Sequence, residues 1–171
     1  TNSMKKLIFA LLSFISLSVF AQNQASPPAT TIQKIGNLNV IIKYYQPSVK
    51  GRLVFGTKEQ KALVPYGEVW RTGANEATTI ELSKDAQIQG QTLAKGTYSV
   101  FTIPGPTEWT VIFNKVAKQW GAYSYKADQD VLRVTGKVSE SKPTEQFTIT
   151  LSNTGQLSFI WDKTSVSVYV K

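Results

Sequence analysis

Apolar and polar side chains alternate along several short stretches of the chain. The clearest stretch is 146–151, where Phe147, Ile149 and Leu151 share one face and two threonines share the other. Strict alternation predicts a strand with one buried face, because successive side chains of an extended chain point to opposite sides. Further strands predicted in this way span 37–45, 50–55, 77–82, 97–103, 109–114, 131–138, 157–161 and 165–170.

Turn residues separate these stretches at short, regular intervals. Glycine occurs at hairpin positions such as Gln89-Gly90 and Lys95-Gly96, and only 58–63 could form a helix, of one or two turns. Many short strands with glycine, proline and asparagine between them are typical of an all-β protein. We therefore expect a single-domain antiparallel β-sandwich with jelly-roll or Greek-key connections, and a closed β-barrel is the alternative.

The first residues have a different pattern. Lys5 and Lys6 precede an apolar run over 7–20, and Val-Phe-Ala at 19–21 has the small-x-Ala form of a cleavage site. The run is short for a membrane span, so a signal peptide is favoured over an uncleaved anchor. Without cysteine, lipid attachment through a cysteine is excluded.

These features predict how the chain is divided. We expect a signal peptide over 1–21, in which 1–3 are a non-native extension, then a loosely held N-terminal lead-in over 22–36 and one β domain over 37–171. The processed protein would be periplasmic or secreted, with no transmembrane segment.

Composition excludes several kinds of chemistry. The chain has neither histidine nor cysteine, which rules out Ser-His and Cys-His catalysis and disulfides and makes a structural zinc site untenable. The formal charge is +8, and it falls to +6 without Lys5 and Lys6. The basic residues are scattered, which indicates a solvated surface. We expect no cofactor, no metal and, for an exported protein, no nucleic-acid partner, despite Lys50 and Arg52 near two tyrosines.

The stretch 65–79 is the densest in special residue types. Gly73 and Asn75 tolerate positive φ and suit a sharp corner, which would bring Arg71, Asn75 and Glu76 together. An arginine fork, an amide and a carboxylate could hold a sugar or a carboxylate ligand. The alternative is structural: Arg71 pairs with Glu76 or with loop carbonyls and fixes the corner.

A long irregular segment, 115–130, carries Trp120, Tyr123 and Tyr125. Flat rings with polar edges suit stacking on a sugar, and long loops often carry function. Alternatively, the loop folds back and its rings cap one end of the sandwich. Asp128 and Asp130 could hold calcium or complete a carboxylate pair with Glu76, but a solvated loop accounts for them as well.

The segment 64–78, read Val-Pro-Tyr-Gly-Glu-Val-Trp-Arg-Thr-Gly-Ala-Asn-Glu-Ala-Thr, resembles the signature of a bacterial family known as a domain of unknown function, numbered 2911. Later blocks at 93–104, 109–114, 120–123 and 130–134 look like those of the same family in the same order, so the resemblance covers about 40–170. It implies a signal peptide and an origin among Bacteroidetes-like bacteria. The family brings no reaction and no ligand, so no catalytic residue is carried over.

Three functions from different classes fit these observations. The first is non-catalytic binding of a glycan or small polar ligand in the cell envelope, with Arg71, Asn75, Glu76, Trp120 and Tyr123 as candidate ligand-binding residues. The second is an acid/base enzyme that acts on carbohydrate through Glu76 and a second carboxylate. The third is a structural or assembly partner of envelope proteins, for which a flat apolar patch would speak.

Overall fold

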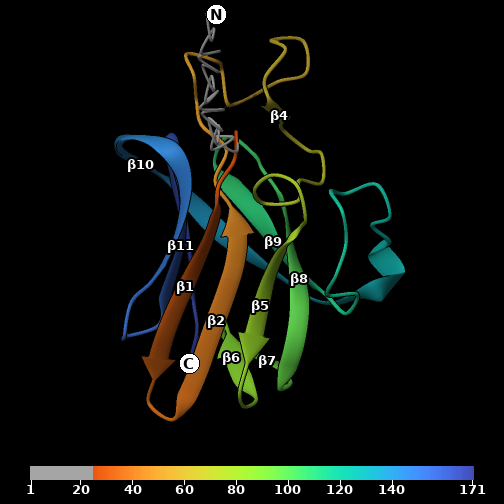
Figure 1. The fold of residues 1–171 in the computed structure, drawn as a ribbon, viewed down its shortest axis with the longest axis vertical. Coiled ribbons are helices and arrows are strands. Elements are labelled where there is room, and N and C mark those ends of the chain that lie inside the picture. Colours follow the sequence, from red (N-terminus) through yellow and green to blue (C-terminus); the bar gives the residue numbers. More distant parts are fainter. Residues whose placement is uncertain (1–24) are drawn as a thin grey trace, which may run out of the picture.

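The computed structural model describes residues 25–171, and strands account for most of them (Figure 1). The predicted signal peptide lies outside the described residues. The one helical element is the short 3₁₀ turn η1 (Ala127–Gln129), and no helix in the described part is long and apolar enough to span a membrane. The strands are β1 (Pro28–Ile35), β2 (Leu38–Tyr45), β3 (Phe55–Gly56), β4 (Val64–Pro65), β5 (Thr78–Leu82), β6 (Ala86–Ile88), β7 (Gln91–Leu93), β8 (Gly96–Ile103), β9 (Glu108–Asn114), β10 (Asp130–Leu151) and β11 (Gln156–Tyr169).

Seven strands form one large antiparallel sheet in the order β1-β2-β5-β8-β9-β10-β11. The prediction of an all-β protein is confirmed. Neighbours in this sheet follow chain order, so it is a meander where we expected jelly-roll or Greek-key connections. The segments between β2 and β5 and between β5 and β8 contribute no strand to this sheet. Two small pairs lie outside it: the parallel β3–β4 pair and the β6–β7 hairpin.

The large sheet curls over its own core. The β10–β11 ribbon shifts register twice between Glu140 and Thr148, and Figure 1 shows β10 arching across one end of the molecule. Its later half faces β1, where the Thr31 hydroxyl donates to the Ile149 carbonyl oxygen at 2.7 Å. The edge strand β1 and the later half of β10 therefore lie side by side although they are far apart in the strand order, so the sheet folds over in a way that is consistent with a two-layer sandwich.

Aromatic rings fill the centre of the core. Trp70 and Trp161 stack with ring centroids 5.8 Å apart, and Phe55, Trp109 and Phe147 pack around them edge to face. Such offset and edge-on arrangements are the favoured geometries for ring pairs. The predicted inward face of 146–151 is confirmed, since its three apolar side chains are buried.

The expected loose lead-in is wrong for most of its length, because 28–35 form β1. This strand pairs with β2 from Pro28 opposite Tyr45 to Ile35 opposite Leu38. Its side chains alternate between exposed and half-buried, as an edge strand over a core requires, but most of the half-buried ones are small or polar. The segment 58–63, our helix candidate, forms a turn.

Candidate functional site

The corner of 70–78 begins where Trp70 meets β8. The Trp70 amide donates to the Thr102 carbonyl oxygen at 2.8 Å, and the reverse bond is 3.0 Å. This short antiparallel contact holds the Trp70 ring in the core, and the half-buried Arg71 follows it. The candidate arginine is therefore one residue away from a ring that is packed in the aromatic core.

Thr72 adopts an unfavourable backbone conformation at this corner. Its φ is +58°, a region that β-branched residues rarely enter, and its side chain is fully buried. Its hydroxyl donates to the Trp70 carbonyl oxygen at 3.2 Å, and its own carbonyl oxygen accepts from the Thr78 hydroxyl at 2.6 Å. Backbone strain of this kind persists only where surrounding contacts enforce it, and it gathers at functional sites.

Gly73 lets the corner lie directly against the end of β2. A Cβ at this position would come within 2.9 Å of the Tyr45 carbonyl oxygen, and its φ of +150° is a conformation that other residues avoid. The Trp70 indole nitrogen donates to the Gly73 carbonyl oxygen at 3.2 Å. The corner is thus a rigid support for the side chains it carries.

Arg71 is half-buried and lacks the predicted partner. The ion pairs within 25–171 join Lys58 to Glu68 and Arg133 to Asp130, so no ion pair links Arg71 to Glu76. The Arg71 Nε atom is buried and finds no hydrogen-bond partner in the described part of the chain. The structure therefore does not show the Arg71–Glu76 ion pair that the structural interpretation of this corner proposed.

The three predicted corner residues line three adjoining recesses. Arg71 lines a recess of about 360 Å³, Asn75 lines one of about 190 Å³ together with Trp120, and Glu76 lines one of about 200 Å³. Tyr45 belongs to the second and the third, and Ser26 to the first and the second. The three side chains therefore line neighbouring recesses, and none of these three recesses contains all of them.

Glu76 stands without a second carboxylate in its recess. Among the described residues, the lining of that recess contains Lys43 and hydroxyl groups but no other acid. Asp128 is exposed, and the Asp130 carboxylate is occupied by other side chains. The pair of acids that glycoside hydrolysis requires is not assembled around Glu76.

The loop 115–126 is fixed to this corner by its backbone. The Ala77 amide donates to the Gln119 carbonyl oxygen at 2.8 Å, and the Gly121 amide donates to the Asn75 carbonyl oxygen at 2.9 Å. These bonds flank Trp120 and place it beside Asn75 and Glu76. The two predicted groups of site residues, far apart in sequence, therefore form one surface.

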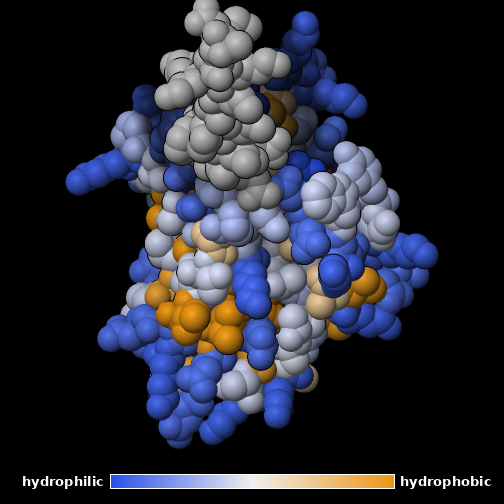
Figure 2. Space-filling view, in the orientation of Figure 1, coloured by the Kyte–Doolittle hydropathy of each residue, from blue (hydrophilic) through white to orange (hydrophobic). Residues whose placement is uncertain are grey.

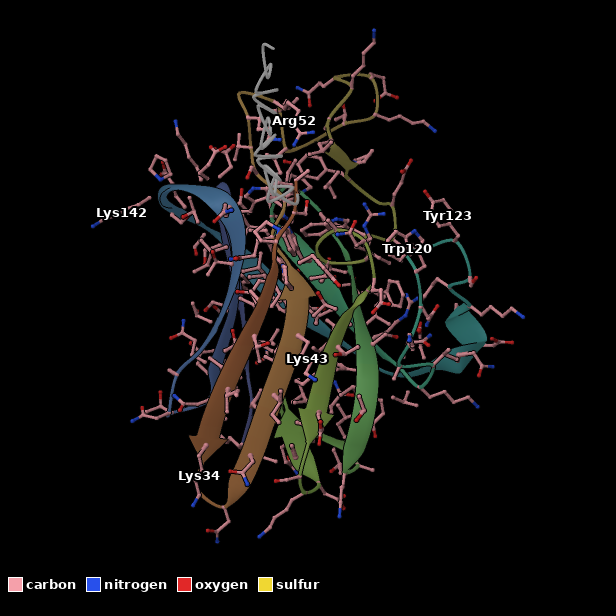
Figure 3. All side chains as sticks on the ribbon, in the orientation of Figure 1. Lys34, Lys43, Arg52, Trp120, Tyr123 and Lys142 are labelled. Atoms are coloured by element: carbon pink, nitrogen blue, oxygen red, sulfur yellow. The ribbon has the colours of Figure 1, made fainter. Side chains whose placement is uncertain are left out.

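The aromatic residues of this loop divide into two kinds. Trp120 and Tyr123 are 62% and 84% exposed, and Figure 3 shows both on the same side of the molecule. Tyr125 instead packs against Phe101 with ring centroids 4.8 Å apart. The capping interpretation holds for Tyr125 alone, and the other two rings face solvent.

A sequence profile of the family described as "Protein of unknown function (DUF2911)" matches residues 26–170. The chain belongs to the DUF2911 family. This confirms the resemblance of the 64–78 segment. No curated protein and no solved structure matched the chain. No established activity accompanies the DUF2911 description, so function has to be argued from the site.

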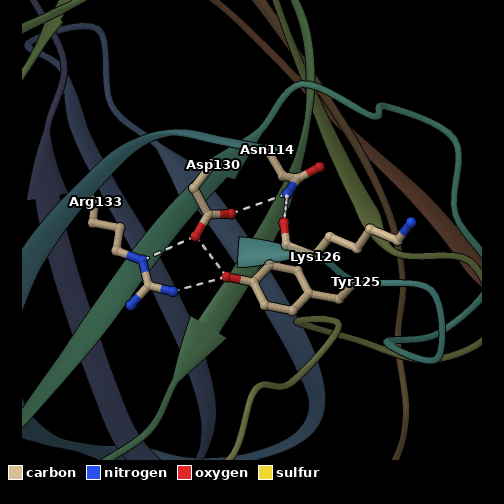
Figure 4. Close-up of polar contacts among 5 residues, drawn as sticks. All are labelled: Asn114, Tyr125, Lys126, Asp130 and Arg133. Carbon is tan, nitrogen blue, oxygen red and sulfur yellow. Dashed lines mark hydrogen bonds and ion pairs between the residues drawn. The ribbon is translucent and has the colours of Figure 1, made fainter. Parts of the chain in front are cut away.

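A polar network, which the sequence analysis missed, holds the other end of the loop in this DUF2911 protein (Figure 4). The Asp130 carboxylate accepts from the Tyr125 hydroxyl at 2.6 Å, from Arg133 Nε at 2.9 Å and from Asn114 Nδ2 at 3.0 Å. Arg133 also donates to the Tyr125 hydroxyl at 2.8 Å. Each group has a partner, so the network fixes the point where the loop enters β10.

Burial and this network shift two pKa values. Burial, and next the hydrogen bond to the Asp130 carboxylate, raise the pKa of Tyr125 above its usual value of 10.0. The hydrogen bond to Asp130 raises the pKa of Arg133, which stays charged throughout. Tyr98, near the start of β8, also has a raised pKa. Burial is the larger cause, and the negative charge of Asp85 is the second. None of these groups lines the three recesses of the corner.

Proposed function

We propose that this DUF2911 protein is an exported, non-catalytic binding protein for a glycan or a small polar ligand of the cell envelope. The binding surface consists of the corner 70–76 and the loop 115–126. Trp120 and Tyr123 supply ring faces, and Arg71, Asn75 and Glu76 supply hydrogen-bonding groups in the recesses beside them.

One observation carries this proposal: the exposed rings stand on a loop that is itself held rigidly. Main-chain hydrogen bonds on both sides of Trp120 attach the loop to a corner that is built on the core. Exposed rings on a fixed backbone lose little conformational freedom when a ligand binds, which favours affinity. A ring that served only packing would lie against the protein, as the half-buried Tyr125 does on Phe101.

The chemistry of the surface suits a sugar. A sugar ring has one apolar face that stacks on an aromatic ring and hydroxyl groups around its edge. Asn75 and Trp120 line the same recess, so an amide and a ring face are available side by side. Glu76 adds an acceptor and Lys43 a donor in the next recess.

Export rests on the sequence pattern of residues 1–21. Intact-mass analysis of the protein recovered from the periplasm or medium tests this part. We expect a chain that begins at Gln22, and a mass that retains 7–20 would contradict the proposal of a cleaved signal peptide.

Binding is tested with a panel of envelope and extracellular oligosaccharides by isothermal titration calorimetry. We expect Trp120→Ala and Tyr123→Ala each to weaken binding at least about tenfold, a free-energy change of about 1.4 kcal/mol. Tyr169→Ala is the matched control, because Tyr169 is a half-exposed ring at the end of β11, outside the three recesses. Equal losses in all three variants, or no binding to any member of the panel, would overturn the proposal.

A further inference from the structure

The recess beside Arg71 is strongly basic. Lys50, Arg52 and Arg71 all line it, and no acidic side chain of the described residues does. Basic residues are otherwise scattered along the chain, so three in one recess is a local concentration of charge. A cavity lined by one sign of charge with low-dielectric walls focuses its field on a ligand of the opposite sign.

Arg71 has hydrogen-bonding capacity that the described protein does not use. Its Nε is shielded from solvent and has no acceptor within 25–171. A buried donor without an acceptor is destabilising unless a ligand or water completes it. Trp109 Nε1 is also buried without an acceptor in the described part, but Arg71 differs in that it lines a recess. A guanidinium group presents paired donors that match the two oxygens of a carboxylate, a sulfate or a phosphate.

The other two cations, Lys50 and Arg52, are exposed residues of one ordered turn. Lys50 and Gly51 both have positive φ, and the Arg52 amide donates to the Val49 carbonyl oxygen at 3.0 Å, which together form a tight turn. The Arg52 guanidinium donates to the carbonyl oxygens of Val49 and Ser48 at 3.0 and 2.6 Å. Its remaining donors are thereby oriented in advance.

The one carboxylate attached to this turn is already engaged. Glu145 Oε1 accepts from the Lys50 backbone amide at 2.9 Å, and Glu145 does not line the recess. The walls of the recess include Trp70 and Trp161, which exclude water from one side. Its volume of about 360 Å³ lies within the range of about 300–1,000 Å³ typical of ligand pockets.

We propose that this recess is an anion subsite, which binds a carboxylate, sulfate or phosphate substituent of an acidic glycan. This rests on the proposed function, because the sugar ring that bears the acid group stacks on Trp120 or Tyr123. Arg71 connects the two parts: it lines the recess, and its Nη1 would lie 3.4 Å from a Cβ on Gly121, next to Trp120. The aromatic surface supplies ring contacts, and the recess selects for negative charge.

The four tryptophan indole groups act as reporters for the test. Trp70 and Trp161 line the recess and Trp120 lies on the aromatic surface. Trp109 lines neither, but its buried ring packs edge to face on Trp70 with ring centroids 6.0 Å apart. Indole ¹H–¹⁵N signals are followed at constant ionic strength during titration with five probes. The probes are inorganic sulfate, inorganic phosphate, trigalacturonate, its neutral methyl ester, and a sulfated heparin tetrasaccharide.

We expect at least one of the two acidic saccharides to shift the Trp70 and Trp161 signals saturably and more strongly than inorganic anions do. The methyl ester should leave both signals in place, and Trp109, which lies behind Trp70 and does not line the recess, should shift less than Trp70 with every probe. Arg71→Lys should weaken the response about tenfold, because it keeps the charge and loses the fork. Lys142→Ala, an exposed lysine on the bend of β10, is the charge-matched control for Lys50→Ala and should have no effect (Figure 3).

The outcomes separate this inference from the proposed function. Saturable shifts of Trp70 and Trp161 with inorganic sulfate or phosphate, while no saccharide shifts any indole signal, support the anion site and overturn glycan binding. Shifts of Trp70 and Trp161 with an acidic saccharide that leaves Trp120 in place support the subsite and overturn stacking on Trp120. Shifts of Trp120 alone support glycan binding and overturn the subsite. If Lys142→Ala reduces the response as much as Lys50→Ala does, the response reflects the charge of the whole protein, and the anion subsite is overturned. Silence of all four signals overturns both.

Discussion

Arg71 and Arg133 lie on two sides of the same loop, and their surroundings differ sharply. Arg133 donates to Asp130 and to Tyr125, and the Asp130 carboxylate is satisfied in turn by Asn114. Arg71 lies in a recess with two other cations, and its buried Nε has no acceptor in the described protein. Arg133 therefore completes a hydrogen-bond network, whereas the Arg71 Nε donor is left free for a ligand.

This difference separates a structural cluster from a candidate site. Polar groups that are all paired fix a geometry and gain nothing from a ligand. Groups that are held in place but lack partners are in the state that a binding site requires before its ligand arrives. The loop 115–130 joins the two: one end is anchored by the Asp130 network, and the other presents Trp120 and Tyr123.

The largest effect is expected when the network is broken at its centre. Asp130→Asn removes the charge that three donors share, and we expect a loss of about 3 kcal/mol in the free energy of unfolding. Asp128→Asn, two positions away and exposed, should stay within about 0.5 kcal/mol. Urea melts measure both, and similar values for the two would show that the network does not carry the loop.

The network also predicts a dependence on alkaline pH. Because the pKa of Tyr125 is raised in the folded state, its contribution is fully present below pH 10, the usual tyrosine value, and is lost as pH rises through the folded pKa. We expect Tyr125→Phe to be less stable than the parent protein at pH 8 by about 1 kcal/mol. The gap should close above pH 10.

Urea melts at steps between pH 8 and 11 follow this gap. Tyr98, whose pKa is raised as well, titrates in both proteins, so it cancels from the comparison. A gap that widens with rising pH would contradict the sign derived for Tyr125.

The alternation of side chains was enough to predict part of this arrangement. The pattern correctly buried the apolar face of 146–151 and separated Trp70 from Arg71. Both follow from local rules, because a strand sends successive side chains to opposite sides wherever it lies. The dense stretch 65–79 was also recognised as a corner, and its positive φ angles at Gly73 and Asn75 confirm that interpretation.

The remainder depends on contacts that the sequence does not display. The Asp130 network exists because the register of β9 against β10 places Asp130 opposite Asn114, sixteen positions away. β1 was missed because an edge strand with half-buried polar side chains has a weak pattern. The basic recess contains Lys50 from one turn and Arg71 from the corner, and only the fold brings these two segments together.

Matched substitutions in the two arginines sharpen the comparison further. Arg133→Lys loses the fork that reaches both Asp130 and Tyr125, so we expect a loss of about 1 kcal/mol. Arg71→Lys breaks no ion pair and should stay within about 0.5 kcal/mol, as should Glu76→Gln. Urea melts at neutral pH measure all three. A loss of about 3 kcal/mol in both corner variants would make the corner a structural staple after all.

The smallest effect is expected where the loop is most exposed. Tyr123 and Tyr125 are two positions apart, yet one ring is 84% exposed and the other packs on Phe101. Tyr125→Ala should cost roughly 2–3 kcal/mol, because it removes a packed ring and two hydrogen bonds. Tyr123→Ala should change stability by less than about 0.5 kcal/mol.

A ring that contributes so little to folding is one that the protein can devote to a ligand. If Tyr123→Ala instead costs as much as Tyr125→Ala, the ring packs in solution against the loop, over Gly121, and is not available for stacking. Hydrogen exchange at the Gly121 amide distinguishes the cases. Protection unchanged in Tyr123→Ala means that the backbone bond to Asn75 alone holds the loop, as a rigid support for an exposed ring requires.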